Sequence, residues 1–341
     1  MTKGPWRAVA AAAGACAMLA GAHAAAASGL TAVWANEGGD KVLRHERRAE
    51  RAPQRNAAWD GATVRVWGAR NEVVNFALIL ESAPGARGVS VHLDRLVAPN
   101  GAAISSPVRP VKGDAVFDYV GRNIEVFVVD YLQILGLSRL SYENYDERHV
   151  PSKMRVPQID PYWGTPSGGW SDRPGADRYF PEIATPHELK PVFDVVPGDS
   201  QTVWFDVYVP KDATPATYSG EIVIRENGEE TRRVPVALTV RDFALPDRPA
   251  AKTMVHFGAY DISERYTGQR WAYPGSPEYA RALPVLQNHW KQLHRHKLTP
   301  VADPTESELP VAQDTVDRLQ GRLYTPANGY DGPGVGVGDD V

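Results

Sequence analysis

The chain has 341 residues, a formal net charge of −4 and one cysteine. The acidic balance argues against nucleic acid or anionic lipid as the main partner. The 30 glycines and 28 prolines favour many turns and long loops over helical packing. A chain of this length typically forms two domains.

The N-terminal segment has the pattern of a secretory signal peptide. A short basic region precedes a small apolar run from Ala8 to Gly21, and the A-x-A sequence at 22–24 supplies a cleavage site. The run is shorter than the ~20 apolar residues that span a membrane. We therefore expect residues 1–24 to be removed and the product to be secreted or periplasmic, without membrane insertion. A lipoprotein acylated at Cys16 is the alternative. Removal leaves no cysteine, so no disulfide is expected.

The densest basic run, RHERRAERAPQR at residues 44–55, is interrupted by Glu46 and Glu50. Mixed charges of this kind are typical of a solvated segment rather than of a binding patch. No nucleic-acid partner is therefore expected.

Apolar and polar residues alternate along several runs between Leu30 and Phe243. These runs lie at 73–80, 89–93, 123–132, 201–209, 218–224 and 234–240. In the run at 201–209, one face carries Val203, Phe205, Val207 and Val209, and the other carries Asp206 and Tyr208. Alternation places one face on a core and the other toward water.

A β-hairpin is predicted at residues 220–240. Asn227 and Gly228 separate two alternating runs, and both residues tolerate the positive φ of a two-residue type I′ turn. Pro235 lies on the outward-facing side of the alternation and has no N–H to donate. Its strand is therefore expected at the edge of a sheet, or the proline nitrogen faces a side without a paired strand. The fold class is therefore mainly β, with an antiparallel β-sandwich at residues 25–248.

A long insertion with little periodicity is expected at 139–190. Loops of this length are usually functional or disordered, and the many aromatic residues favour an ordered one. Aromatic rings can stack on a sugar and acids can bind its hydroxyls. The candidate ligand-binding residues are Trp163, Trp170, Asp172, Asp177, Tyr179, Phe180 and Glu182. Aromatics that only pin the loop, and acids that are solvated or bind Ca²⁺, are the alternatives.

The pattern changes after residue 248. A short apolar strand is expected at 253–258, and a helix follows with Ser276 as its N-cap and Pro277 at its first position. A second strand is expected at 297–303. Strand, helix and strand begin an α/β layer, whereas a (β/α)₈ barrel takes about 250 residues. We therefore expect residues 249–341 to form a truncated barrel start, with the apolar stripe of Leu283, Leu286 and Trp290 partly exposed.

No metal or cofactor site is indicated. His289, His294 and His296 do not share one helix face. The G-x-G-x-G at 332–338 has no helix after it, so a dinucleotide site is not expected.

Several of these segments resemble the glycoside hydrolase family 123-like proteins, including the related domain of unknown function 4091. The matching sequences are WFDVYVPKDATPATYSGEIVI (204–224), VPVALTVRDFALP (234–246), RYFPEIATP (178–186) and KTMVHFG (252–258). The resemblance covers about residues 60–300. One departure is Ala216, where the family commonly has glycine.

The resemblance implies a β-sandwich that leads directly into a catalytic barrel. It also implies hydrolysis of a glycosidic bond, assisted by a substrate acetamido group and an adjacent Asp-Glu pair. No such pair matches in this sequence, so no catalytic residue is assigned. We expect an accessory, glycan-associated region of a secreted glycoside hydrolase-like protein, catalytically incomplete as given. A stand-alone carbohydrate-binding or structural β-sandwich is the alternative, and the sequence leaves the oligomeric state open.

Overall fold

The computed structural model describes residues 28–106, 122–133, 178–246, 255–273 and 275–298, with single residues at 253 and 322. It also gives the backbone of the strands at 155–159, 166–170 and 300–302. The expected signal peptide lies outside the described residues. Among the described residues, none of the helices has the length and apolar character needed to cross a bilayer.

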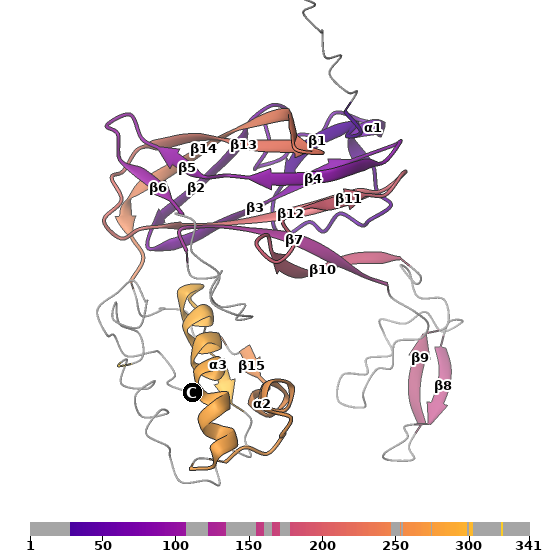
Figure 1. Cartoon of the computed structure of the whole chain (residues 1–341), viewed down its shortest axis with the longest axis vertical. Coiled ribbons are helices and arrows are strands. Elements are labelled where there is room, and N and C mark those ends of the chain that lie inside the picture. Colours follow the sequence, from indigo (N-terminus) through magenta and orange to yellow (C-terminus); the bar gives the residue numbers. More distant parts are fainter. Residues whose placement is uncertain are drawn as a thin grey trace, which may run out of the picture.

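Two β-sheets stack to form a sandwich (Figure 1). Sheet A is antiparallel throughout, in the order β1 (Ala32–Asn36), β3 (Glu72–Glu81), β12 (Ser200–Val209), β7 (Ile124–Gln133) and β10 (Tyr179–Pro186). Sheet B has the order β11 (Phe193–Val195), β4 (Ala86–His92), β13 (Thr217–Glu226), β14 (Glu229–Ala244) and β2 (Val64–Arg70). Two short strands, β5 (Arg95–Val97) and β6 (Ala103–Ser105), extend sheet B beside β13. The predicted sandwich is confirmed, although β2 pairs with β14 in parallel.

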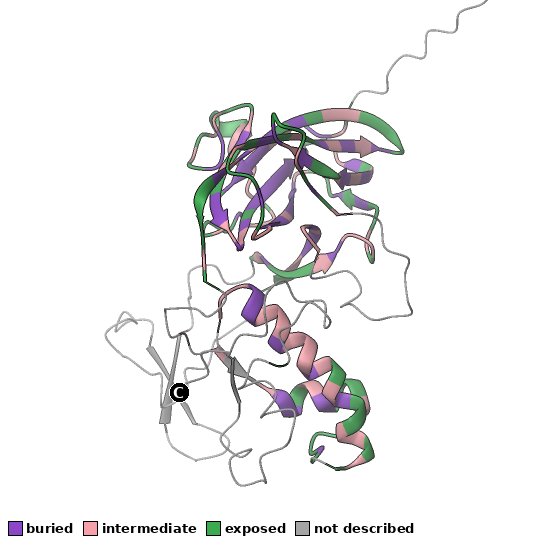
Figure 2. Ribbon diagram, turned by 90° about the vertical axis from the view of Figure 1, so that its left-hand side faces the viewer, coloured by how far each residue is buried: buried purple, intermediate pink, exposed green. Residues whose placement is uncertain are grey.

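The core lies between the two sheets, where each contributes one face of alternating apolar residues (Figure 2). Phe76 of β3 and Phe205 of β12 are fully buried and stack with ring centroids 4.7 Å apart. Ile222 and Leu238 of sheet B are also fully buried. Burial of both inner faces is the main stabilising contribution to this domain.

The hairpin is present as predicted. Asn227 has φ 51° and Gly228 has φ 85°, and these two residues connect β13 to β14. Pro235 is exposed and pairs with Glu221 of β13. The parallel pairing of β14 with β2 starts only at Val236, so the proline nitrogen lies where its strand has no second neighbour.

The outer face of β12 differs from the expectation. Asp206 and Tyr208 are 8% and 3% exposed, so they do not face water. The reason is the C-terminal end of helix α3 (Pro277–Arg295), which covers them. The guanidinium of Arg295 lies 4.2 Å from the centre of the Tyr208 ring, and His296 lies 3.8 Å from the Asp206 carboxylate.

A fully buried carboxylate, Glu81, fixes the short helix α1 (Arg48–Arg51) on the sandwich. Its Oε1 accepts hydrogen bonds from the Trp34 indole at 2.7 Å and from the Ala49 amide at 2.8 Å. Its Oε2 accepts from the Glu50 amide at 3.3 Å. The carboxylate thus satisfies amide groups that the start of a helix leaves without partners.

The segment after the sandwich forms a βαβ unit. Its elements are β15 (Val255–Phe257), α2 (Ala259–Thr267), α3 (Pro277–Arg295) and β16 (Pro300–Ala302), and β15 pairs with β16 in parallel. Ser276 caps α3 as predicted, because its hydroxyl accepts from the Tyr279 amide at 3.1 Å. Helix α2 was not predicted. The barrel interpretation of this unit stays a prediction, because a parallel βαβ pair occurs in many α/β folds.

The expectation that the apolar stripe of α3 stays partly exposed is wrong for two of its members. Leu286 and Trp290 are 4% and 6% exposed, and only Leu283 is half-buried. These residues pack with Ala259 and Ile262 of α2 into a small cluster.

The predicted long loop contains regular structure. A backbone hairpin is formed by β8 (Arg155–Ile159) and β9 (Pro166–Trp170), and residues 179–186 form β10 at the edge of sheet A. The pairing of β10 with β7 was not predicted, because the two prolines of β10 and its register shift near Ile183 hide the alternation.

Candidate functional site

A cavity of about 370 Å³ lies at one side of the sandwich, between β4 of sheet B and β7 of sheet A. Its apolar wall consists of Val91, Leu93, Ile124, Val126 and Pro191. Its polar lining consists of His92, Asp94, Ser106, Arg122, His187 and Glu188. Concave sites that combine an apolar wall with a few polar groups are typical ligand sites.

The chain crosses from sheet A to sheet B at this cavity. After β10 ends at Pro186, the His187 amide donates to the Val126 carbonyl of β7 at 2.9 Å. The Lys190 amide then donates to the His187 carbonyl at 3.0 Å, which closes a turn before β11 joins sheet B. This turn holds the side chains of His187 and Glu188 against the cavity.

The two histidines come from different sheets and meet edge to face. The ring centroids of His92 and His187 lie 4.6 Å apart with an angle of 79° between the planes. Burial lowers the pKa of both imidazoles, and the His92 ring lowers the pKa of His187 further. The nearby Asp94 carboxylate acts in the opposite direction on the pKa of His92. Both rings are therefore neutral at pH 7.

An ion pair closes the side of the cavity next to β7. Arg122 binds Glu188, and their side chains are 9% and 26% exposed. The other carboxylate oxygen, Glu188 Oε2, is buried and has no hydrogen-bond partner among the described residues. The same holds for His187 Nε2. The site thus presents two buried polar atoms without a hydrogen-bond partner among the described residues.

The residues predicted from the aromatic loop do not line this cavity. Trp163, Asp172 and Asp177 lie outside the described residues, as does the side chain of Trp170 in β9. Tyr179, Phe180 and Glu182 lie on β10, near the end opposite to His187.

Two of the described members of that set, Tyr179 and Glu182, contact the segment that follows β1. The guanidinium of Arg44 lies 5.0 Å from the centre of the Tyr179 ring, and His45 meets the same ring edge to face at 5.4 Å. Glu182 forms an exposed ion pair with Lys41 at 2.7 Å. These contacts attach β10 to the sandwich, and the ligand-binding role of this set stays a prediction.

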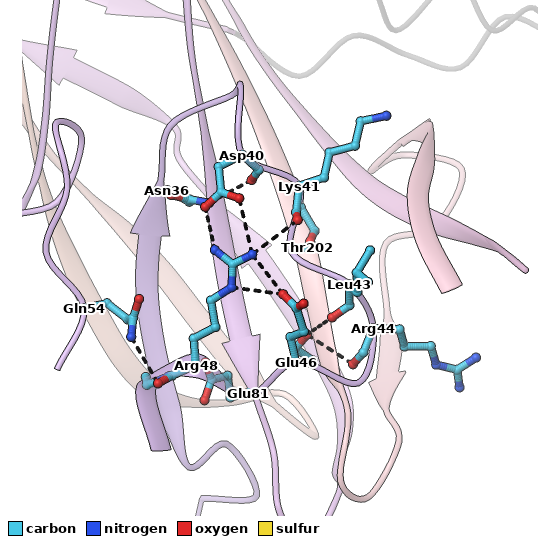
Figure 3. Close-up of polar contacts among 12 residues, drawn as sticks. Asn36, Asp40, Lys41, Leu43, Arg44, Glu46, Arg48, Gln54, Glu81 and Thr202 are labelled. Atoms are coloured by element: carbon cyan, nitrogen blue, oxygen red, sulfur yellow. Dashed lines mark hydrogen bonds and ion pairs between the residues drawn. The ribbon is translucent and has the colours of Figure 1, made fainter. Parts of the chain in front are cut away.

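Several arginines of the basic run at 44–55 pair with neighbouring acids, as Figure 3 shows for Arg48. This guanidinium binds Asp40 at 2.5 Å and Glu46 at 2.9 Å. Its hydrogen bond holds the pKa of the Asp40 carboxyl below the usual value. Arg44 in turn binds Asp199 at 2.7 Å. Part of the run is therefore engaged in ion pairs within the sandwich, and the absence of a nucleic-acid partner stays a prediction.

The cavity residues were not predicted from the sequence. His92 ends one alternating run and His187 follows another strand far along the chain, so no local spacing links them. The signal that could have found them is the pair His187-Glu188 directly after a strand, since strand ends often carry functional side chains. Among the described residues, no group of three or more side chains could hold a metal ion.

Comparison with known proteins gives a distant structural likeness. Neither a protein-family model nor a curated protein matches the chain. A family 123 glycoside hydrolase from Clostridium perfringens, described in work on glycolipid glycan hydrolysis, matches with a TM-score of 0.50 and 12% identity. That match covers 78% of this chain and 37% of the enzyme's chain.

A second match is MyfA, the major subunit of Myf fimbriae from Yersinia enterocolitica, in a complex with galactose. Its TM-score is 0.19 at 11% identity, over 52% of this chain and 91% of that chain. This likeness is too weak to support a conclusion about this chain. Because the two sequences are only 12% identical, the match to the glycoside hydrolase shows a shared fold.

Proposed function

We propose that the chain contains the accessory, glycan-associated β-sandwich of a secreted glycoside hydrolase-like protein. The observation that carries this proposal is the likeness to the Clostridium perfringens enzyme, with a TM-score of 0.50 over 78% of the chain. The resemblance of residues 204–224 and 234–246 to the family 123-like proteins supports it, because these segments form β12, β13 and β14. Export through the N-terminal segment belongs to the same proposal and predicts a mature chain that starts at Ala25.

In this proposal, the βαβ unit at 255–302 corresponds to the first part of a barrel-type domain. The parallel pairing of β15 with β16 and the two intervening helices support that assignment. The chain spans little more than a third of the enzyme that it resembles, at 37%. The likeness therefore does not show the activity or the substrate of a whole enzyme.

The described acids on the helices of the βαβ unit form ion pairs with neighbouring arginines. Asp261 and Glu264 both pair with Arg270, and Glu278 pairs with Arg281. Asp261 and Glu264 are exposed and Glu278 is half-buried, and all three are ion-paired on helix surfaces. A glycosidase instead needs two carboxyl groups on either side of one bound sugar.

Two measurements on the exported chain test the proposal. A glycan array, followed by calorimetric titration, is expected to show binding of at least one glycan. An assay with an aryl N-acetylhexosaminide is expected to show no turnover. Absence of binding at millimolar sugar contradicts the glycan-associated role. Turnover that is abolished by D172N contradicts the accessory role.

A further inference from the structure

We propose that the cavity between β4 and β7 binds one neutral, hydroxyl-rich ring, a monosaccharide unit, through His187, Glu188 and Arg122. This inference rests on the proposed function, because it names the place where the sandwich holds a glycan. It concerns different residues from those of the aromatic loop.

The tautomer of His187 follows from its contacts. The backbone of Pro191 raises the pKa of the His187 imidazole, as a backbone group that accepts from the ring does. Proline has no amide hydrogen, so its carbonyl accepts and a ring nitrogen donates. Since Nε2 has no partner among the described residues, the donor is Nδ1. Nε2 of the neutral ring therefore carries a lone pair.

Two buried acceptors of the cavity thus need donors. These are His187 Nε2 and Glu188 Oε2, and both belong to the turn that crosses between the sheets. A buried acceptor without a donor is costly, whereas a hydroxyl group of a ligand satisfies it. The Arg122 guanidinium, which lines the same cavity, is a donor. The best ligand group both donates and accepts, as a hydroxyl does.

The charges of the lining favour a ligand without net charge. Asp94 and Glu188 disfavour an anion. The Arg122 guanidinium already pairs with Glu188, so it occupies the place where an ammonium group would neutralise that carboxylate. The two histidines are neutral, because burial lowers the pKa of each. A neutral polyol avoids repulsion from either sign.

The dimensions and the apolar wall agree with a single sugar ring. A volume of about 370 Å³ is near the lower end of the range for small-molecule sites, about 300–1,000 Å³. Ile124, Val126 and Pro191 offer an apolar surface for the C–H face of a pyranose. A ring with hydroxyls on its edge and C–H groups on its face matches both parts of the lining.

The test uses the full chain with ¹⁵N-labelled histidine, titrated with N-acetylglucosamine, galactose and glucose. Inorganic phosphate and cyclohexylammonium serve as charged probes. We expect at least one sugar to shift the Nε2 resonance of His187 and neither charged probe to do so. E188Q replaces an acceptor by a donor and is expected to weaken sugar binding about tenfold or more.

The matched control is E221Q, an exposed carboxylate that pairs with Arg233 on the outside of sheet B. This variant is expected to bind as the unchanged chain does. If E188Q fails to fold, V126F takes its place, because a larger side chain there fills the cavity without removing a charge. Sugar binding that survives both variants overturns the inference, and so does a response to either charged probe alone.

Failure of the site and failure of the proposed function are distinguishable. Binding on the glycan array with unchanged His187 resonances overturns the cavity site and leaves the glycan-associated role in place. Shifts of His187 with free sugars, without binding on the array, support the site and contradict that role. If neither experiment detects binding, the cavity site and the glycan-associated role are both overturned.

Discussion

In the sandwich, two sheets face each other and bury residues such as Phe76, Phe205, Ile222 and Leu238 completely. In the βαβ unit, the buried cluster of the described residues consists of Ala259, Ala282, Leu286 and Trp290. The unit also relies on the sandwich, because the end of α3 lies on β12 through Arg295 and His296. A region with two facing layers is stabilised by its own core, whereas a single layer depends on its neighbour.

The largest expected effect on stability comes from substitutions that test the core of the sandwich and the cluster of the βαβ unit separately. F205A removes a ring that stacks on Phe76 and is fully buried. We expect it to lower the free energy of unfolding of the sandwich by about 3–5 kcal/mol. W290A, in the cluster of α3, is expected to leave the sandwich transition in urea unchanged and to speed proteolysis of residues 255–298. A common loss of stability in both variants would mean that the two regions unfold as one.

The next effect concerns a buried polar anchor of the sandwich. E81Q exchanges one carboxylate oxygen for a donor that faces the amide of Ala49 or Glu50. The loss of these charge-assisted bonds is expected to cost about 2–3 kcal/mol in urea unfolding. The control is E46Q, whose carboxylate is a third exposed and pairs with Arg48. Its expected cost is under about 1 kcal/mol.

A smaller effect is expected where the regions meet. Arg295 stacks on Tyr208 and donates to the carbonyl of Arg122 at 2.6 Å. R295A should weaken this attachment by about 1 kcal/mol. Limited proteolysis should then cut α3 several times faster, while the urea midpoint of the sandwich stays nearly constant. Equal cutting rates would show that α3 is held by its own cluster.

The smallest expected effect is a pH dependence of the sandwich transition to which the two cavity histidines contribute. The pKa values of His92 and His187 lie below the usual value of 6.5 in the folded chain. Their contribution to stability is therefore present above pH 6.5 and is lost as the pH falls through the folded values. The urea midpoint should decrease between pH 7 and pH 5, and H187Q should reduce that decrease. An unchanged slope in H187Q would exclude this histidine as the cause.

Local signals in the sequence were sufficient for part of this fold. The Asn227-Gly228 turn and the cap at Ser276 depend on residues within a few positions of each other, and both are present. Helix α2 was missed, because its N-cap is Gly258, which has no capping side chain. The αL glycine after it, Gly268, was the remaining signal.

These local signals could not predict contacts between segments that are far apart in the sequence. The parallel pairing of β2 with β14 joins segments that no turn connects, and the burial of Asp206 depends on a helix from another region. The cavity has the same origin, since His92 and His187 meet only when β10 ends beside β7 and β4 lies opposite. Sequence patterns report the periodicity of one segment and do not report which segments meet.

The long strand β14 has a mechanical consequence. It leads toward the βαβ unit, and near its end it is bonded to β13 on one side and to β2 on the other, antiparallel and parallel respectively. A pulling force from the C-terminal side, directed along the strand, therefore loads two ladders in shear, so many hydrogen bonds must break together. The junction is built to resist tension, and a tethered load should unravel the helical segment before it extracts this strand.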